Sequence, residues 1–105
     1  MILYNITISV DASCAKDWLN YMVEEHIPAV LATGHFRDYK LCRVEGDEQG
    51  GETYAVQYIA HSPAAFNKYQ TECAPSLQAE FNKKWGDKVA SFRTILPVLH
   101  EGKAS

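Results

Sequence analysis

A histidine and a proline lie two residues apart in a segment whose apolar spacing is that of a helix. His26 and Pro28 belong to the stretch EEHIPAVLATGHF, residues 24–36. An imidazole titrates in the pH range where enzymes transfer protons, so His26 is the first candidate for a general base. At about 100° per residue, His26 falls on the helical face of Met22 and Val30 and should point toward the core.

Two roles are open for His26. In one, it is a buried neutral histidine bonded to a carbonyl or to a tyrosine hydroxyl, with Tyr4 and Tyr58 as the expected partners. In the other, it lines a ligand pocket as a base or as a group that orients the ligand. Burial predicts a pKa below the ordinary value of about 6.5 in both cases. Pro28 removes a hydrogen bond to Glu24 and should bend the helix on its solvent side.

No metal site is predicted, because the other three histidines show no ligand spacing with His26. The cysteines are three in number and widely spaced: Cys14, Cys42 and Cys73. Without a CxxC pair they do not form a thiolate zinc site, and we interpret them as reduced core thiols of a cytoplasmic protein. No cofactor is predicted either.

The bulk composition excludes several classes of protein. The 105 residues carry a net charge of −3, with 47% hydrophobic and 22% charged residues, which is typical of one globular domain. Lys and Arg are scattered without a basic stripe, so no nucleic-acid partner is expected. No segment has the length and hydrophobicity of a membrane span or a signal peptide, so no membrane partner is expected.

The periodicity predicts strands alternating with helices. Period-two alternation predicts strands at residues 2–10, 36–44, 53–60 and 88–100. Helical spacing predicts one helix that follows a cap at Asp11 or Ser13 and runs to about residue 32. A second helix is predicted, which Pro75 divides into 64–73 and 75–85. Ser62 is the expected N-cap before Pro63, while Gly34 and Gly86 are the expected helix ends. The polar stretch EGDEQGG, residues 45–51, is predicted to be a hairpin loop.

The order β-α-β-β-α-β predicts an α+β fold of the ferredoxin-like type, as a single domain over residues 1–105. Its four-stranded antiparallel sheet should have the order 4-1-3-2, with two helices on one face. The helix-covered face is predicted to carry Ile2, Tyr4, Ile6, Ile8, Cys42, Val44, Tyr54, Val56, Tyr58, Phe92, Leu96 and Val98. The open face is predicted to carry Leu3, Asn5, Thr7, Ser9, Tyr39, Leu41, Arg43, Ala55, Gln57, Ile59, Ser91, Arg93 and Ile95.

The predicted open face mixes apolar and polar side chains, which is typical of a sheet-to-sheet dimer interface. We therefore expect the protein to bind a second copy of itself. The candidates for polar contacts across that interface are Asn5, Tyr39, Arg43, Gln57 and Arg93.

The chain also resembles a known superfamily, through YNITI, HIPAVLATGHF, YKLCRV, TYAVQY, APSLQAEF and WGDKVASFRT. It resembles the dimeric α+β barrel proteins, in which two ferredoxin-like protomers pack sheet to sheet. Within them it is most similar to a small bacterial family described only as a domain of unknown function. The resemblance implies a homodimer with a ligand pocket between the helices and the sheet. Several members carry a His followed by Pro two residues later, as His26 and Pro28 do here.

The superfamily includes small monooxygenases, haem-degrading enzymes, lactone isomerases and stress-response dimers. The haem-degrading members use an Asn, a Trp and a haem-ligating His, and no residue of this chain is assigned those roles. Two functions therefore stay open. The first is a small-molecule-binding or regulatory dimer. The second is a cofactor-free monooxygenase-like or isomerase-like enzyme that acts on a small apolar or aromatic acid. The candidate ligand-binding residues are His26, Tyr4, Tyr58, Trp85 and Met22, with His26 as the candidate catalytic residue.

Overall fold

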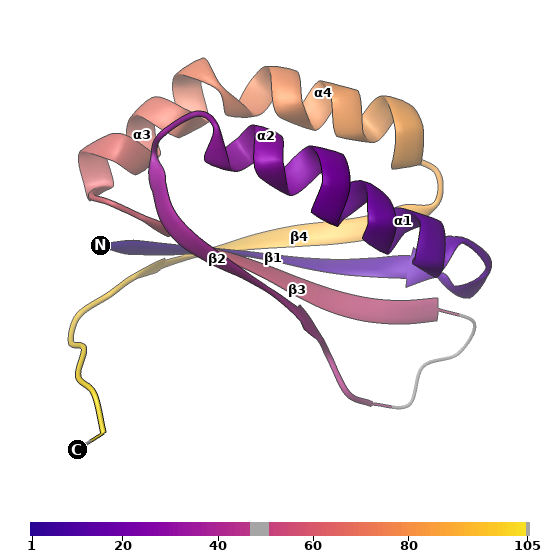
Figure 1. Cartoon of the computed structure of the whole chain (residues 1–105), viewed down its shortest axis with the longest axis horizontal. Coiled ribbons are helices and arrows are strands. Elements are labelled where there is room, and N and C mark those ends of the chain that lie inside the picture. The colour runs from indigo at the N-terminus through magenta and orange to yellow at the C-terminus, as the bar shows by residue number, and fades with distance from the viewer. Residues whose placement is uncertain (47–50, 105) are drawn as a thin grey trace.

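The computed structural model describes residues 1–46 and 51–104 (Figure 1). The strands are β1 Ile2–Asp11, β2 Phe36–Arg43, β3 Gly51–Ala60 and β4 Val89–Pro97. The helical segments are η1 Ala12–Cys14, α1 Ala15–Tyr21, η2 Met22–His26, α2 Ile27–Leu31, α3 Pro63–Glu72 and α4 Ala74–Trp85. The predicted hairpin loop at residues 45–51 falls largely outside the described residues.

The strands form one antiparallel sheet in the order β2-β3-β1-β4. The predicted order 4-1-3-2 is therefore confirmed, and the fold is the ferredoxin-like α+β fold. Helices α1 to α4 lie on one side of the sheet, and none of them covers the other face (Figure 1). Among the described residues, no helix has the length and apolar character needed to cross a membrane.

The second helical region begins and breaks where the sequence predicts. The Ser62 hydroxyl oxygen accepts a hydrogen bond from the Ala65 N–H at 3.0 Å, and Pro63 occupies the first helical position. The helix is interrupted at Cys73, just before Pro75, and α4 continues to Trp85.

The first helical region contains a turn that the sequence analysis did not predict. Between α1 and α2, residues Met22–His26 form a π-helical turn, in which the Ile27 N–H donates to the Met22 carbonyl five residues back. The turn ends just before Pro28, which is exposed as predicted. Since Pro28 lacks an N–H, a shift to wider hydrogen bonding upstream accommodates it without a sharp break. Gly34 follows the end of α2 with a φ of +82°, as expected for a helix C-terminus.

The core lies between the helices and the sheet. Its largest fully buried side chains include Trp18 and Met22 from the first helical region and Tyr4, Val56 and Tyr58 from the sheet. Aromatic rings meet there edge to face and tilted, as Tyr4 and Phe66 do at 5.0 Å between centroids. The core therefore includes four buried tyrosines, Tyr4, Tyr54, Tyr58 and Tyr69.

The side-chain phase predicted for β2 is wrong. The register shifts between Phe36 and Asp38, so one extra residue is inserted into the strand. Beyond this bulge Tyr39 pairs with Tyr58 and Arg43 with Tyr54, which places them on the helix-covered face. Cys42 and Val44 were predicted on the helix-covered face, and they lie on the open face instead. A bulge of one residue reverses every side chain that follows it, and Cys42 is accordingly exposed rather than a core thiol.

The phase predicted for β4 is also wrong. Arg93 pairs with Ile6, and Ser91 pairs with Ile8, so both lie on the helix-covered face. Apolar Phe92 and Leu96 lie on the open face, where Phe92 is 63% exposed. The prediction assumed that the apolar set must face the helices. β4 is an edge strand, and even on the side that faces the helices Arg93 is exposed. The positions of the apolar residues in β4 therefore do not show which side of the strand faces the helices.

Candidate functional site

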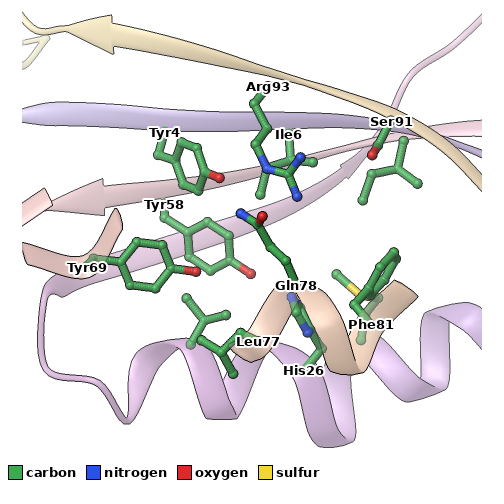
Figure 2. A pocket seen from close by; sticks show the side chains of 13 residues that line it. Tyr4, Ile6, His26, Tyr58, Tyr69, Leu77, Gln78, Phe81, Ser91 and Arg93 are labelled. Atoms are coloured by element: carbon green, nitrogen blue, oxygen red, sulfur yellow. The ribbon is translucent and has the colours of Figure 1, made fainter. Parts of the chain in front are cut away.

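A cleft opens between the sheet and the helices, with about 450 Å³ of space not filled by protein atoms, including its open mouth. The described residues that line it come from both layers of the fold, the sheet and the helices: Tyr4, Ile6, Ile8, Met22, His26, Val30, Tyr58, Tyr69, Leu77, Gln78, Phe81, Ser91 and Arg93. The walls are mainly aliphatic and aromatic. The polar ends of Tyr4, Tyr58, Gln78, His26 and Arg93 gather in its middle (Figure 2).

His26 reaches the cleft from the last residue of the π-helical turn. Its ring lies between the rings of Tyr21, at 6.2 Å, and Phe81, at 5.2 Å. The hydrogen bond predicted from Tyr4, Tyr58 or a carbonyl is not formed within the described part of the chain. The neutral ring is instead held by packing between two aromatic side chains, and its polar edge is available to the cleft.

The electrostatics of the cleft favour the neutral form of His26. Burial, followed by the positive charge of Arg93, lowers the pKa of His26 from its usual 6.5 to about 4. The predicted direction of this shift agrees with the structure. At neutral pH the ring is therefore an uncharged donor and acceptor, and it is a weak base.

Three tyrosines bring their hydroxyl groups to the same cleft. Burial raises the pKa of Tyr4, Tyr58 and Tyr69, and for Tyr4 the Arg93 guanidinium and the Gln78 amide act in the opposite direction. Ring contacts hold them together, with 6.3 Å between the centroids of Tyr4 and Tyr58 and 6.2 Å between those of Tyr4 and Tyr69. All three hydroxyls are protonated at neutral pH and can donate to a ligand oxygen.

Arg93 is the only side chain with a permanent charge among the described residues that line the cleft, and no carboxylate lines it there. Arg93 extends from β4 toward Gln78 in Figure 2. Arg93 was predicted on the open face, but its pairing with Ile6 places it on the helix-covered face. The arrangement gives the cleft one cationic end and no compensating negative group, which favours an anionic ligand.

The predicted ligand-binding residues are brought together except for one. Tyr4, Met22, His26 and Tyr58 line the cleft. Trp85 does not: it is 4% exposed at the end of α4 and packs against Tyr21 at 5.7 Å. The C-terminal position of Trp85 on a 12-residue helix carries it past the cleft.

The predicted dimer-face residues divide between the two faces of the sheet. Asn5 and Gln57 pair with each other on the open face, as expected. Tyr39, Arg43 and Arg93 lie on the helix-covered face, for the reasons of register given above.

The sequence analysis placed two polar cleft residues, Ser91 and Arg93, on the open face, and it did not name two others, Gln78 and Tyr69. Gln78 lies on α4 among Ala74, Phe81 and Trp85, which are buried. Their spacing of three or four residues defines the inward face of α4. A polar residue on that face is the same signal that singled out His26. For Tyr69 no chemical signal was available, because a tyrosine on an apolar stripe is common in a core.

Within residues 1–46 and 51–104, no group of three or more His, Cys, Asp or Glu side chains is placed to hold a metal ion. The aromatic and amide groups of the cleft are suited to hydrogen bonding and ring stacking rather than to metal coordination.

The fold is shared with several solved structures. HapK from Hahella chejuensis is 13% identical with a TM-score of 0.72, over 100% of this chain and 99% of that chain. A variant of MhuD with two manganese protoporphyrin IX molecules bound per active site is 18% identical with a TM-score of 0.71, over 99% of this chain and 100% of that chain. A dimeric ferredoxin-like protein from an uncultured marine organism is 10% identical with a TM-score of 0.70, over 99% of this chain and 100% of that chain.

At these identities the likeness shows the fold alone. No curated protein matches the sequence. A protein-family model does match it, over residues 1–99, and it is described as "Domain of unknown function (DUF4286)". The resemblance inferred from the sequence is thereby confirmed, and the chain belongs to this family.

Proposed function

We propose that the protein is a homodimer that binds a small apolar or aromatic acid in the cleft between its helices and its sheet. The observation that carries this proposal is the convergence of Arg93, Gln78, His26 and the tyrosine hydroxyls inside walls that are otherwise apolar. An apolar pocket with a few convergent polar groups is the usual form of a small-molecule site.

The acid is inferred from the charge of the cleft. Arg93 is unopposed by a carboxylate among the described lining residues, and a guanidinium binds a carboxylate through two parallel hydrogen bonds. The aromatic part is inferred from Phe81, Tyr4 and Tyr69, whose rings offer flat surfaces for stacking.

Arg93→Gln tests the anionic end. Benzoate and 2-naphthoate are titrated against the protein by thermal shift and calorimetry. Both acids should raise the melting temperature, and Arg93→Gln should weaken their binding by about tenfold or more. Arg43→Gln is the matched control, because Arg43 is an exposed arginine on the same sheet face that does not line the cleft. Equal affinities in the two variants would contradict the proposal.

The second copy is proposed to cover the open face of the sheet. Phe92 and Leu96 are exposed there, beside the partly buried Leu3 and Ile59. A face of this kind is costly to leave in water, and an isologous sheet-to-sheet contact buries it. The dimeric ferredoxin-like neighbour supports this assembly. Light scattering at micromolar concentration should give the mass of two chains, and a mass of one chain at every concentration would contradict it.

An enzymatic role is the second candidate, and the packing of His26 is the observation that favours it. Its ring faces the cleft in the neutral form without a protein hydrogen-bond partner among the described residues. A cofactor-free monooxygenase-like or isomerase-like reaction would use it as the base. In that case His26→Gln would abolish conversion of a bound acid while leaving its affinity within about twofold. Its low pKa makes the binding function the better supported of the two.

We also propose that the whole chain is a single domain and that the dimer works in the bacterial cytoplasm. Cys14, Cys42 and Cys73 are unpaired, and Cys42 is exposed. An exposed free thiol suits a reducing compartment. Fractionation of cells that express the tagged protein would place it, and recovery from the periplasm or the medium would contradict this location.

A further inference from the structure

Tyr58 carries a buried polar atom that the protein leaves unpaired. Its side chain is 0% exposed, and its hydroxyl has no hydrogen-bond partner among residues 1–46 and 51–104. Buried hydroxyl groups in proteins are almost always paired, because an unpaired one loses its bonds to water without replacement. An exception of this kind inside a cleft calls for a partner from outside the protein chain.

The surroundings of Tyr58 define what that partner must be. Phe36 and Tyr4 pack on its ring, with centroids at 5.2 Å and 6.3 Å. Burial, followed by the neighbouring Tyr69 and Tyr4, raises its pKa, so the hydroxyl stays protonated and acts as a donor. Its side chain points toward the same part of the cleft as Gln78 and His26 (Figure 2). The missing partner is therefore an oxygen that accepts a hydrogen bond.

Tyr58 and Arg93 reach the cleft from different strands. Tyr58 stands on β3, which is separated from β4 by β1. The Arg93 charge lowers the pKa values of Tyr4, Tyr69 and His26, whereas the side chains that shift the pKa of Tyr58 are tyrosines. A ligand that binds both side chains needs an anionic group for Arg93 and a second oxygen for Tyr58.

We propose that the Tyr58 hydroxyl is a specificity-determining donor, so that the cleft selects aromatic carboxylates bearing a second oxygen, as hydroxyl or carbonyl, at the far end of the ring. This inference rests on the proposed function, because it assumes that Arg93 holds the carboxylate. It adds the chemical class of the ligand: a hydroxy- or oxo-substituted aromatic acid rather than a plain one.

The binding experiment compares benzoate with 4-hydroxybenzoate, two acids that differ by the distal oxygen alone. Calorimetry on the wild-type dimer should show that 4-hydroxybenzoate binds about tenfold more tightly, the value of one well-formed buried hydrogen bond. Tyr58→Phe removes the hydroxyl and should reduce this preference to within about twofold, with little change in the benzoate affinity. Tyr39→Phe is the matched control and should keep the full preference, because Tyr39 is 40% exposed and does not line the cleft.

A stability measurement tests the unpaired hydroxyl without any ligand. Tyr58→Phe breaks no hydrogen bond of the protein, so its urea midpoint should equal or exceed that of the wild type. Tyr54→Phe is the contrasting variant, because the Tyr54 hydroxyl donates to the Glu52 carboxylate, and its midpoint should fall. A midpoint for Tyr58→Phe as low as that of Tyr54→Phe would show that the Tyr58 hydroxyl is already paired, which overturns the inference.

The outcomes separate this inference from the proposed function. If both acids bind equally, and Arg93→Gln weakens both, the anionic site stands and the role of Tyr58 is overturned. If the preference for 4-hydroxybenzoate survives in Tyr58→Phe, another group reads the distal oxygen and the inference is likewise overturned. If neither acid binds to the wild type at about 1 mM, the proposed site and the inference fall together.

Discussion

His26 should make the stability of the protein fall steeply on mild acidification. The pKa of His26 is lowered from 6.5 to about 4 in the folded protein. Between these two values the unfolded chain binds a proton that the folded chain does not, so protonation favours unfolding. The stabilising effect of the neutral ring is complete above pH 6.5, declines as the pH falls through this window, and reaches its minimum below pH 4.

The size of the effect follows from the two pKa values. With a His26 pKa of 6.5 in the unfolded chain and about 4 in the folded chain, proton binding lowers the free energy of unfolding by about 2 kcal/mol at pH 5 and by about 3 kcal/mol at pH 4. A domain of this size unfolds with a free energy of only about 5–15 kcal/mol. The loss from one histidine is therefore large enough to measure directly.

Urea unfolding at fixed protein concentration between pH 4 and pH 7 provides the assay, with the wild type compared against His26→Gln. Other groups also titrate in this range, but their contributions are shared and cancel in the difference between the two proteins. The difference should change by about 2 kcal/mol from pH 7 to pH 5. His100→Gln is the control, since His100 is exposed near the C-terminus, and its profile should follow that of the wild type.

Parallel profiles for the wild type and His26→Gln would refute the reasoning. The same conclusion would follow if NMR gave His26 a pKa near 6.5. Arg93→Gln offers an internal test, because the Arg93 charge is the second cause of the shift. Its removal should raise the pKa of His26 while leaving the larger effect of burial in place.

Three further changes have defined outcomes. Gly34→Ala should lower the free energy of unfolding by about 1–2 kcal/mol, because a side chain disfavours the φ of +82° although nothing lies within 4 Å of its Cβ; an unchanged urea midpoint would show that this turn relaxes freely. Ser62→Ala should cost about 1 kcal/mol in the same assay, because the bond from the Ala65 N–H is lost; Ser62→Thr keeps an oxygen there and should lose less. Phe92→Lys should shift the light-scattering mass toward one chain at low concentration, since Phe92 is 63% exposed on the open face; a dimer as stable as the wild type would place the interface elsewhere.

The element order and the helix ends were predictable because they depend on local chemistry. Ser62 caps α3 and Gly34 closes the first helical region, as their residue types indicate. The faces of β1 and β3 were equally predictable, because both are central strands with one covered side. Tyr4 and Tyr58 alternate with Asn5 and Gln57 as their sequences show.

The faces of the edge strands were not predictable, because the decisive information is not local. On β2 a bulge of one residue turns Tyr39 and Arg43 toward the helices, and nothing in the sequence FRDYKLCR marks its position. On β4 the apolar residues Phe92 and Leu96 face away from the helices. Hydrophobicity reports burial in the assembled protein, and a residue buried against a second copy leaves the same pattern as a core residue.

The site itself was half predictable, through polar residues that interrupt apolar stripes. His26 on the first helical region and Gln78 on α4 both break an inward-facing stripe. A polar side chain there lowers stability unless something pairs with it, so its presence in two helices that share one cleft supports the proposed ligand site. Arg93 could not be found in this way, since its placement depends on the pairing of β4 with β1.

The π-helical turn answers why a proline follows His26 so closely. A helix that continued regularly through Pro28 would leave the carbonyl of Glu24 without a donor. The π-helical turn at Met22–His26 accommodates this defect by adding one residue to the turn. The added residue also changes the angle at which the next side chains leave the helix. His26 is the last residue of this turn; its ring lies 5.2 Å from that of Phe81 and lines the cleft. Pro28 therefore lies directly after the π-helical turn that carries His26, on the solvent side of the helix.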